Sequence, residues 1–147
     1  TLMLIQPIAA ENYAEWRVLW QGFLDFHDVE LDEEVTASVW KRLLNSDNPL
    51  KGLVAIDQNK VIGFTHFYFH GASWNTSHYC YLEDLYVDQT VRSKGTGRAL
   101  VEGVKEAARK RGASKLYWHT NADNKNAQAF YDKIATLTDY VRYDLNL

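Results

Sequence analysis

Apolar and aromatic side chains recur at helical spacing through the first part of the chain. Residues 10–27 place them three or four positions apart, as one buried helix face requires: Tyr13, Trp16, Leu19, Trp20, Phe23 and Leu24. Residues 35–45 predict a second helix, which ends at the turn-forming stretch Ser-Asp-Asn-Pro. An apolar strand over residues 2–8 precedes both helices. We interpret Trp16, Trp20 and Trp40 as core aromatics.

The middle of the chain has the pattern of a β-sheet. Residues 52–56 and 61–69 are β-branched and aromatic runs separated by Asp-Gln-Asn-Lys, which predicts a hairpin. A loop over residues 71–77 then leads into a longer strand over residues 78–87.

The remainder alternates between helical and extended patterns. It predicts a helix over 95–111, a strand over 115–120, a helix over 124–135 and a final strand over 139–147. The resulting order is β-αα-βββ-α-β-α-β. Because a helical crossover joins parallel strands and a hairpin joins antiparallel ones, we expect a mixed, mostly antiparallel α/β sheet with helices on both faces. We assign residues 1–147 to a single domain.

The composition bears on the cellular compartment and on membrane association. The single cysteine, Cys80, excludes an intramolecular disulfide and favours a reducing compartment. No apolar run reaches the roughly 18 residues of a membrane span, so we expect no membrane partner and a cytoplasmic location.

Charge is divided unevenly along the chain. Residues 1–90 carry 5 Lys and Arg against 13 Asp and Glu, whereas residues 91–147 carry 11 against 6. This division suits two ligands of opposite charge, or simply two solvated surfaces. An overall net charge of −3 disfavours a nucleic-acid partner, because phosphate contacts need a dense basic surface.

A glycine-rich loop, Arg-Ser-Lys-Gly-Thr-Gly-Arg, joins the strand over 78–87 to the helix that follows. Backbone N–H groups at a helix N-terminus bind phosphate oxygens, and glycines let the backbone approach an anion closely. The GxxxxGK[ST] pattern is absent, and GxGxxG fails because Leu100 stands at its third glycine. The remaining Arg-x-x-Gly-x-Gly pattern is typical of a pyrophosphate site, although a tight turn that caps a surface helix also fits the glycines.

Several stretches together resemble the GNAT superfamily of acyl-CoA-dependent N-acyltransferases. They are Asp-Leu-Tyr-Val, Arg-x-x-Gly-x-Gly-x-x-Leu, Tyr-Trp-His-Thr and Asn-x-x-Ala-x-x-x-Tyr, all within residues 84–131. The stretch Tyr-Leu-Glu-Asp-Leu-Tyr-Val, with Tyr131 downstream, is similar to the spermidine/spermine N-acetyltransferases. The wider series also resembles fungal histone and polyamine acetyltransferases.

The resemblance implies acetyl-CoA as cofactor and CoA as product. It implies that the loop backbone holds the pyrophosphate, through Arg92, Ser93, Lys94, Gly95, Thr96, Gly97 and Arg98. Main-chain groups of Leu85, Tyr86 and Val87 would pair with the pantetheine arm, and Asn124 and Tyr131 would contact the thioester end. The family's Tyr-x-x-x-Gly-Phe turn lacks its glycine here, and Tyr140 is the candidate for the aromatic position.

An amine attacks a thioester only after losing its proton, so the site needs a general base. Glu83 matches by motif the glutamate that has this role in the polyamine enzymes. Strand alternation puts Glu83 and Leu85 on one face and Asp84 on the other, and Asp84 is the alternative acting group if a β-bulge shifts the register. A solvated or salt-bridged strand residue is the alternative for Glu83. Tyr131 is the candidate acid for the departing thiolate, with core packing as its alternative.

Two other chemistries have weak support. Cys80 lies in a strand without a histidine at a recognisable spacing, so we do not expect a covalent acyl-enzyme. His66 and His70 are four residues apart in a strand and therefore distant from each other, and we expect no metal site.

The resemblance implies that the connection between the first two helices lines the acceptor side of the site. Residues 25–34 contain six acids and no Lys or Arg, which would attract a cation unless the segment is only a solvated loop. Trp74, in the loop after the middle hairpin, is able to stack on an alkylammonium chain. The acceptor candidates are Asp28, Glu30, Trp74, Glu83 and Asp84.

These features predict an N-acetyltransferase that moves the acetyl group of acetyl-CoA, in a ternary complex, to a primary amine of a small cationic acceptor. A polyamine, a diamine and a lysine-like amino acid are the candidate acceptors. A protein or peptide N-acetyltransferase stays open, as does a non-catalytic acyl-CoA sensor, which the presence of Glu83 and Tyr131 disfavours. The alternating end over 139–147 suits a strand exchanged in a homodimer, and equally an ordinary last strand.

Overall fold

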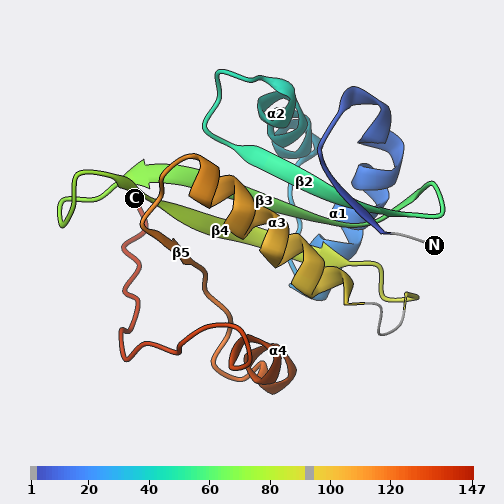
Figure 1. Cartoon of the computed structure of the whole chain (residues 1–147). Helices are drawn as coiled ribbons and strands as arrows, with labels where there is room; N and C mark the ends of the chain where they lie inside the picture. Colours follow the sequence, from blue (N-terminus) through green and yellow to red (C-terminus); the bar gives the residue numbers. More distant parts are fainter. Residues whose placement is uncertain (1–2, 92–94) are drawn as a thin grey trace.

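One sheet runs through the molecule with its five strands in chain order. The computed structural model describes residues 3–91 and 95–147 (Figure 1). Neighbouring strands are antiparallel except β4 and β5, which are parallel, so the predicted mixed sheet is confirmed. The strands are β1 (Leu4–Pro7), β2 (Lys51–Asp57), β3 (Lys60–Gly71), β4 (His78–Val87) and β5 (Lys115–Tyr117).

Helices cover both faces of the sheet, as predicted, with α3 on one side and α1 and α2 on the other (Figure 1). Side chains of β2 show why: Val54 enters the core with α1 and α2, whereas Leu53 and Ala55 enter the core with α3. A strand buried on both faces is apolar throughout, which explains its continuous hydrophobic pattern. The helices are α1 (Tyr13–Phe26), α2 (Glu33–Leu44), α3 (Thr96–Lys110) and α4 (Lys125–Tyr131), with a 3₁₀ turn over Ala10–Asn12.

Aromatic residues of α1 form the centre of the α1–α2 core, which confirms their interpretation as core residues. Trp16 is fully buried, and its ring stacks on that of Trp20 with centroids 5.6 Å apart. Each indole N–H has a buried acceptor: Trp20 Nε1 donates to Thr36 Oγ1 at 3.0 Å, and Trp16 Nε1 donates to His66 Nε2 at 3.1 Å. The first bond joins α1 to α2 and the second joins α1 to β3.

The predicted final strand is wrong. Residues 139–147 lie outside the sheet without regular structure, and side chains that alternate as in a strand are exposed, including Val141 at 78%, Tyr143 at 91% and Leu145 at 86%. Alternation reports a side-chain period, but a strand also needs a neighbour for its ladder of hydrogen bonds. In the described part of the chain, the tail has no such neighbour.

Candidate active site

A cleft of about 580 Å³ lies beside the part of β4 that β5 does not cover. Figure 1 shows the chain leaving the sheet after β5 on its way to α4. Among the described residues, β5 pairs with β4 only over Tyr79–Tyr81, because the chain leaves the sheet after Tyr117 and turns toward α4. The far half of β4, the start of α3, the segment after β5 and α4 therefore line one continuous opening. Its lining includes Glu83, Leu85, Tyr86, Val87, Gly97, Asn124, Tyr131 and Arg142.

The free edge of β4 presents main-chain groups to this cleft. Asp88 N–H donates to Ile62 O at 2.8 Å, so Asp88 faces β3. Because peptide groups alternate along a strand, Leu85 and Val87 direct their N–H and C=O groups away from β3, toward the cleft. The Tyr86 side chain instead packs on α1, where an added Cβ on Gly22 would lie 2.6 Å from its hydroxyl.

Two glycines at the N-terminus of α3 are explained by different physical requirements. Gly95 precedes the helix with φ of +69°, a left-handed conformation that favours glycine. Gly97 lines the cleft, and an added Cβ there would meet nothing closer than Phe130 at 3.9 Å. The space beside Gly97 is therefore open to a ligand rather than filled by the protein.

This helix N-terminus fits a pyrophosphate group. The first turn of a helix carries unpaired N–H groups and a partial positive charge. Thr96 Oγ1 is buried there without a hydrogen-bond partner in the described part of the chain. Arg92, Ser93 and Lys94, which were predicted to contribute to the same loop, lie outside the described residues.

The opposite wall of the cleft comes from α4 and the segment before it. Asn124 caps the helix, because its Oδ1 accepts a hydrogen bond from Ala127 N at 3.1 Å. Tyr131 ends the helix, seven residues later and hence on the same face, with its ring 5.3 Å from that of Trp118. Burial raises the pKa of the Tyr131 phenol, so the hydroxyl keeps its proton at neutral pH.

A β-bulge in β4 determines where the two candidate acids point. His66 pairs with Asp84 and Phe67 pairs with Leu82, which leaves Glu83 as the extra residue. The simple alternation predicted for this strand is therefore wrong. Asp84 bonds to His66 on the α1 side of the sheet, whereas Leu85 packs in the core with α3.

Glu83 is the exposed acid of this pair and lies in the cleft. Partial burial of its carboxyl raises the pKa of Glu83, and the neighbouring charge of Asp84 raises it further, while Arg142 and Arg42 act in the opposite direction. A carboxylate with a raised pKa is a better proton acceptor near neutral pH.

Sequence analysis missed several groups around Glu83. Arg142 comes from the tail and lines the cleft, and Arg42 comes from α2. Tyr81 and His119 lie at the same end, with Tyr81 Oη 3.1 Å from His119 Nδ1. These residues are distant in sequence and carry no shared motif, so only the stretch Tyr-Trp-His-Thr placed one of them near the site.

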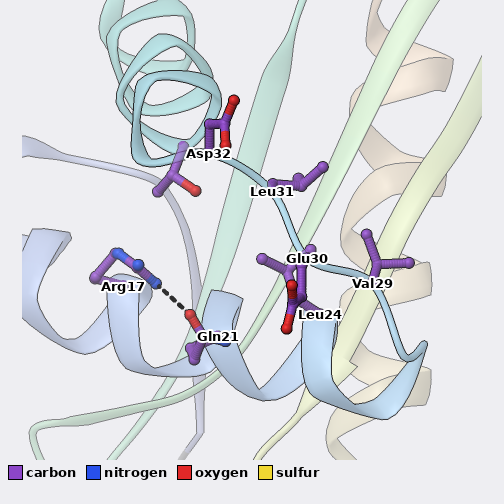
Figure 2. A pocket seen from close by; sticks show the side chains of 8 residues that line it. Arg17, Gln21, Leu24, Val29, Glu30, Leu31 and Asp32 are labelled. Carbon is purple, nitrogen blue, oxygen red and sulfur yellow. Dashed lines mark hydrogen bonds between the residues drawn. The ribbon is translucent and has the colours of Figure 1, made fainter.

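Phe26 and His27, which belong to the acidic segment predicted for the acceptor side, line this cleft, but none of the acids of residues 25–34 is part of its described lining. Glu30 and Asp32 line a separate cavity of about 370 Å³ between α1 and the connection to α2 (Figure 2). Glu33 forms an ion pair with Arg17 at 2.9 Å, which neutralises part of the segment. Asp28 is exposed in a left-handed turn with φ of +54°.

The structure also shows where Trp74 and Cys80 lie. Trp74 is 84% exposed in the loop between β3 and β4, away from the parting of β4 and β5. Cys80 is fully buried in the core with α3, and burial raises the pKa of its thiol to about 11. A buried, protonated thiol is a poor nucleophile, in keeping with the interpretation of Cys80 as a packing residue.

Comparison with known proteins identifies the family. Residues 13–135 match the Acetyltransferase (GNAT) family, and the chain belongs to it. The chain is 33% identical to the D-amino-acid N-acetyltransferase HPA3 of Saccharomyces cerevisiae, over 98% of this chain and 91% of that protein. It is 34% identical to a thialysine N-epsilon-acetyltransferase of Caenorhabditis elegans, over 61% of this chain and 53% of that protein.

A solved structure matches the fold over nearly its full length. The structure of AAC(6')-Iy in complex with the bisubstrate analogue CoA-S-monomethyl-acetylneamine superposes with a TM-score of 0.86, covering 100% of this chain and 99% of that one, at 18% identity. The chain is thus an acetyl-CoA-dependent N-acetyltransferase of GNAT fold, which confirms the predicted enzyme class and cofactor.

Proposed function

We propose that this enzyme transfers the acetyl group of acetyl-CoA directly to the primary amine of a small acceptor, in the cleft between β4 and β5. The observation that carries the proposal is the continuity of this cleft. It leads from the N-terminus of α3, along the free edge of β4, to Glu83 and Tyr131.

Residues of the chain divide the binding of acetyl-CoA among three elements. We assign the pyrophosphate to the N–H groups of Thr96, Gly97 and Arg98 at the start of α3. The free edge of β4 at Leu85–Val87 suits the amide groups of the pantetheine arm, which would pair with it as an added strand does. Asn124 and Tyr131 lie on the α4 wall, where they would contact the thioester end.

Two side chains of the cleft have the properties that the proton transfers require. Acetyl-CoA supplies the acetyl group as a thioester. Glu83 takes a proton from the acceptor's ammonium group, which has a pKa of about 10.4 when it resembles lysine. Tyr131 carries a proton at neutral pH and donates it to the departing sulfur. Both residues line the same cleft, so direct transfer needs no covalent enzyme intermediate.

Among the predicted acceptors, the charges of the cleft favour an amino acid over a polyamine or diamine. Among the described residues, the lining of the cleft combines the carboxylate of Glu83 with the guanidinium of Arg142, so it complements an amine and a carboxylate together. Arg142 Nε bonds to Asp144 Oδ1 at 2.7 Å, which leaves its two terminal nitrogens for the acceptor's carboxylate. Asp28 and Glu30, which would attract a second ammonium group, do not contribute to this lining. The names of two relatives, a D-amino-acid and a thialysine acetyltransferase, support the same class.

We propose a cytoplasmic location. Cys80 is a free thiol, as expected in a reducing compartment. None of the helices in the described part of the chain is long and apolar enough to cross a membrane.

We also propose that two copies of the chain associate through the tail. The exposed apolar side chains of residues 139–147 and the outer edge of β5, which carries no strand among the described residues, suit pairing between copies. We expect sedimentation velocity to give a dimer, and a Val141→Asp, Tyr143→Asp double variant to give a monomer of 17.0 kDa. A wild-type chain that sediments as a monomer at every concentration contradicts this proposal.

Gly97→Asp tests the pyrophosphate assignment. The fold tolerates a Cβ at this position, because its nearest neighbour would be 3.9 Å away, but the added carboxylate repels the pyrophosphate. We expect acetyl-CoA affinity, measured by calorimetry, to fall by roughly ten- to a hundredfold with little change in melting temperature. Gly71→Asp adds the same charge at an open position and serves as control. Wild-type affinity in a folded Gly97→Asp variant would remove the assignment.

Glu83→Gln tests the general base. The carboxylate acts only above its pKa, so wild-type activity should fall as the pH drops through that raised pKa, and this acid limb should disappear in the variant. Above the limb we expect kcat to fall by roughly 10²- to 10⁴-fold, with acetyl-CoA affinity unchanged. Glu102→Gln makes the same change on the exposed face of α3 and should behave as wild type. An acid limb that persists in Glu83→Gln would assign the base to another group.

A further inference from the structure

We propose that Trp16, His66 and Asp84 form a buried hydrogen-bonded chain that positions Glu83 for proton transfer. The inference rests on the proposed function, because it assigns these three residues to the support of its general base. None of them touches the acceptor in this account, so they are positioning residues rather than catalytic ones.

The direction of the hydrogen bonds determines the state of the imidazole. An indole Nε1 only donates, so His66 Nε2, 3.1 Å away, accepts and carries no proton. The remaining ring nitrogen, Nδ1, then carries the proton and donates to Asp84 Oδ2 at 2.9 Å. The geometry assigns an imidazole that is protonated at Nδ1 and unprotonated at Nε2, with Asp84 Oδ2 as the acceptor of the Nδ1–H group.

The hydrogen bonds between Trp16, His66 and Asp84 lie inside the core rather than at the surface. Trp16 is 0% exposed and His66 is 1% exposed, and the His66 ring lies 4.7 Å from that of Phe64. Polar groups in such surroundings cost free energy unless each is hydrogen-bonded, and apolar side chains would fill the same space without that cost. Because apolar side chains would fill this space at a lower cost in free energy, we infer that the polar groups of Trp16, His66 and Asp84 serve a purpose other than packing.

The chain ends at the bulge that sets the direction of Glu83. Asp84 is held twice, since its side chain bonds to His66 and its main-chain oxygen accepts from Thr65 Oγ1 at 2.8 Å. On the other side of Glu83, Leu82 is buried in the core with α3. With both neighbours fixed, the extra residue of the bulge has little freedom except to enter the cleft.

Asp84 also acts on Glu83 through its charge. The charged and titratable groups that interact with Glu83 come from four elements: Asp84 and Tyr81 of β4, Tyr68 of β3, Arg42 of α2 and Arg142 of the tail. Asp84 is the acidic member of this set and raises the pKa of Glu83, whereas the two arginines lower it. Removal of the Asp84 charge should therefore lower that pKa.

The Asp84→Asn variant tests the effect of the Asp84 charge on Glu83 while the hydrogen bond to His66 is kept. Asparagine keeps an oxygen that accepts from His66 Nδ1–H, so the bulge should persist while the negative charge is lost. We expect the acid limb of the kcat/KM profile to move to lower pH and kcat above the limb to fall roughly three- to tenfold, because Glu83 becomes a weaker base. The KM for acetyl-CoA should not change. Asp47→Asn, in an exposed loop, removes the same charge as control.

Two measurements that need no turnover distinguish failure of this inference from failure of the proposed function. Carboxyl NMR of ¹³C-labelled glutamate should show Glu83 titrating at lower pH in Asp84→Asn than in wild type. ¹⁵N NMR of wild-type His66 at neutral pH should show a protonated Nδ1 and an unprotonated Nε2. An unchanged Glu83 titration, or a proton on Nε2 of His66, overturns the positioning chain whether or not the enzyme acetylates any tested amine.

Discussion

Beyond Tyr81, β4 loses its parallel neighbour, and the free strand edge that results determines where the rest of the cleft lies. Main-chain groups of Leu85 and Val87 that a neighbouring strand would otherwise satisfy face the cleft, where the Val87 carbonyl accepts a hydrogen bond from Gln89 Nε2 at 2.9 Å. The same parting brings the N-terminus of α3 to one end of that edge and the α4 wall with Tyr131 to its side. A ligand that carries amide groups and a pyrophosphate complements both features, as the CoA part of acetyl-CoA does.

The bulge at Glu83 links this edge to the aromatic core on the other side of the sheet. Asp84 faces inward to His66 and Trp16, while Glu83 faces outward into the cleft beside Arg142. In the proposed positioning chain, the packing of α1 on the sheet and the direction of Glu83, the proposed general base, depend on the same few hydrogen bonds. A core substitution at Trp16 would accordingly affect chemistry as well as stability, although its side chain does not line the cleft.

Local patterns predicted the helices and the hairpin, because helical period and strand alternation are encoded in neighbouring residues. Local patterns did not predict features that depend on residues distant in sequence. The tail over 139–147 alternates like a strand but pairs with no strand of the described residues. The bulge at Glu83 is visible only in the register of β4 with His66 and Phe67. The acids of residues 25–34 were expected near the acceptor from the family resemblance and from their charge. Glu33 instead pairs with Arg17, and Arg142 of the tail lines the cleft.

The most direct test is release of CoA thiol from acetyl-CoA by the wild-type enzyme, with the acetylated product identified by mass spectrometry. The acceptors would be D- and L-amino acids, lysine, thialysine, putrescine, spermidine and a histone-tail peptide, beside a control without acceptor. The account predicts amine-dependent release and an N-acetylated amino acid as the preferred product. Tight binding of acetyl-CoA with background release for every acceptor would contradict it.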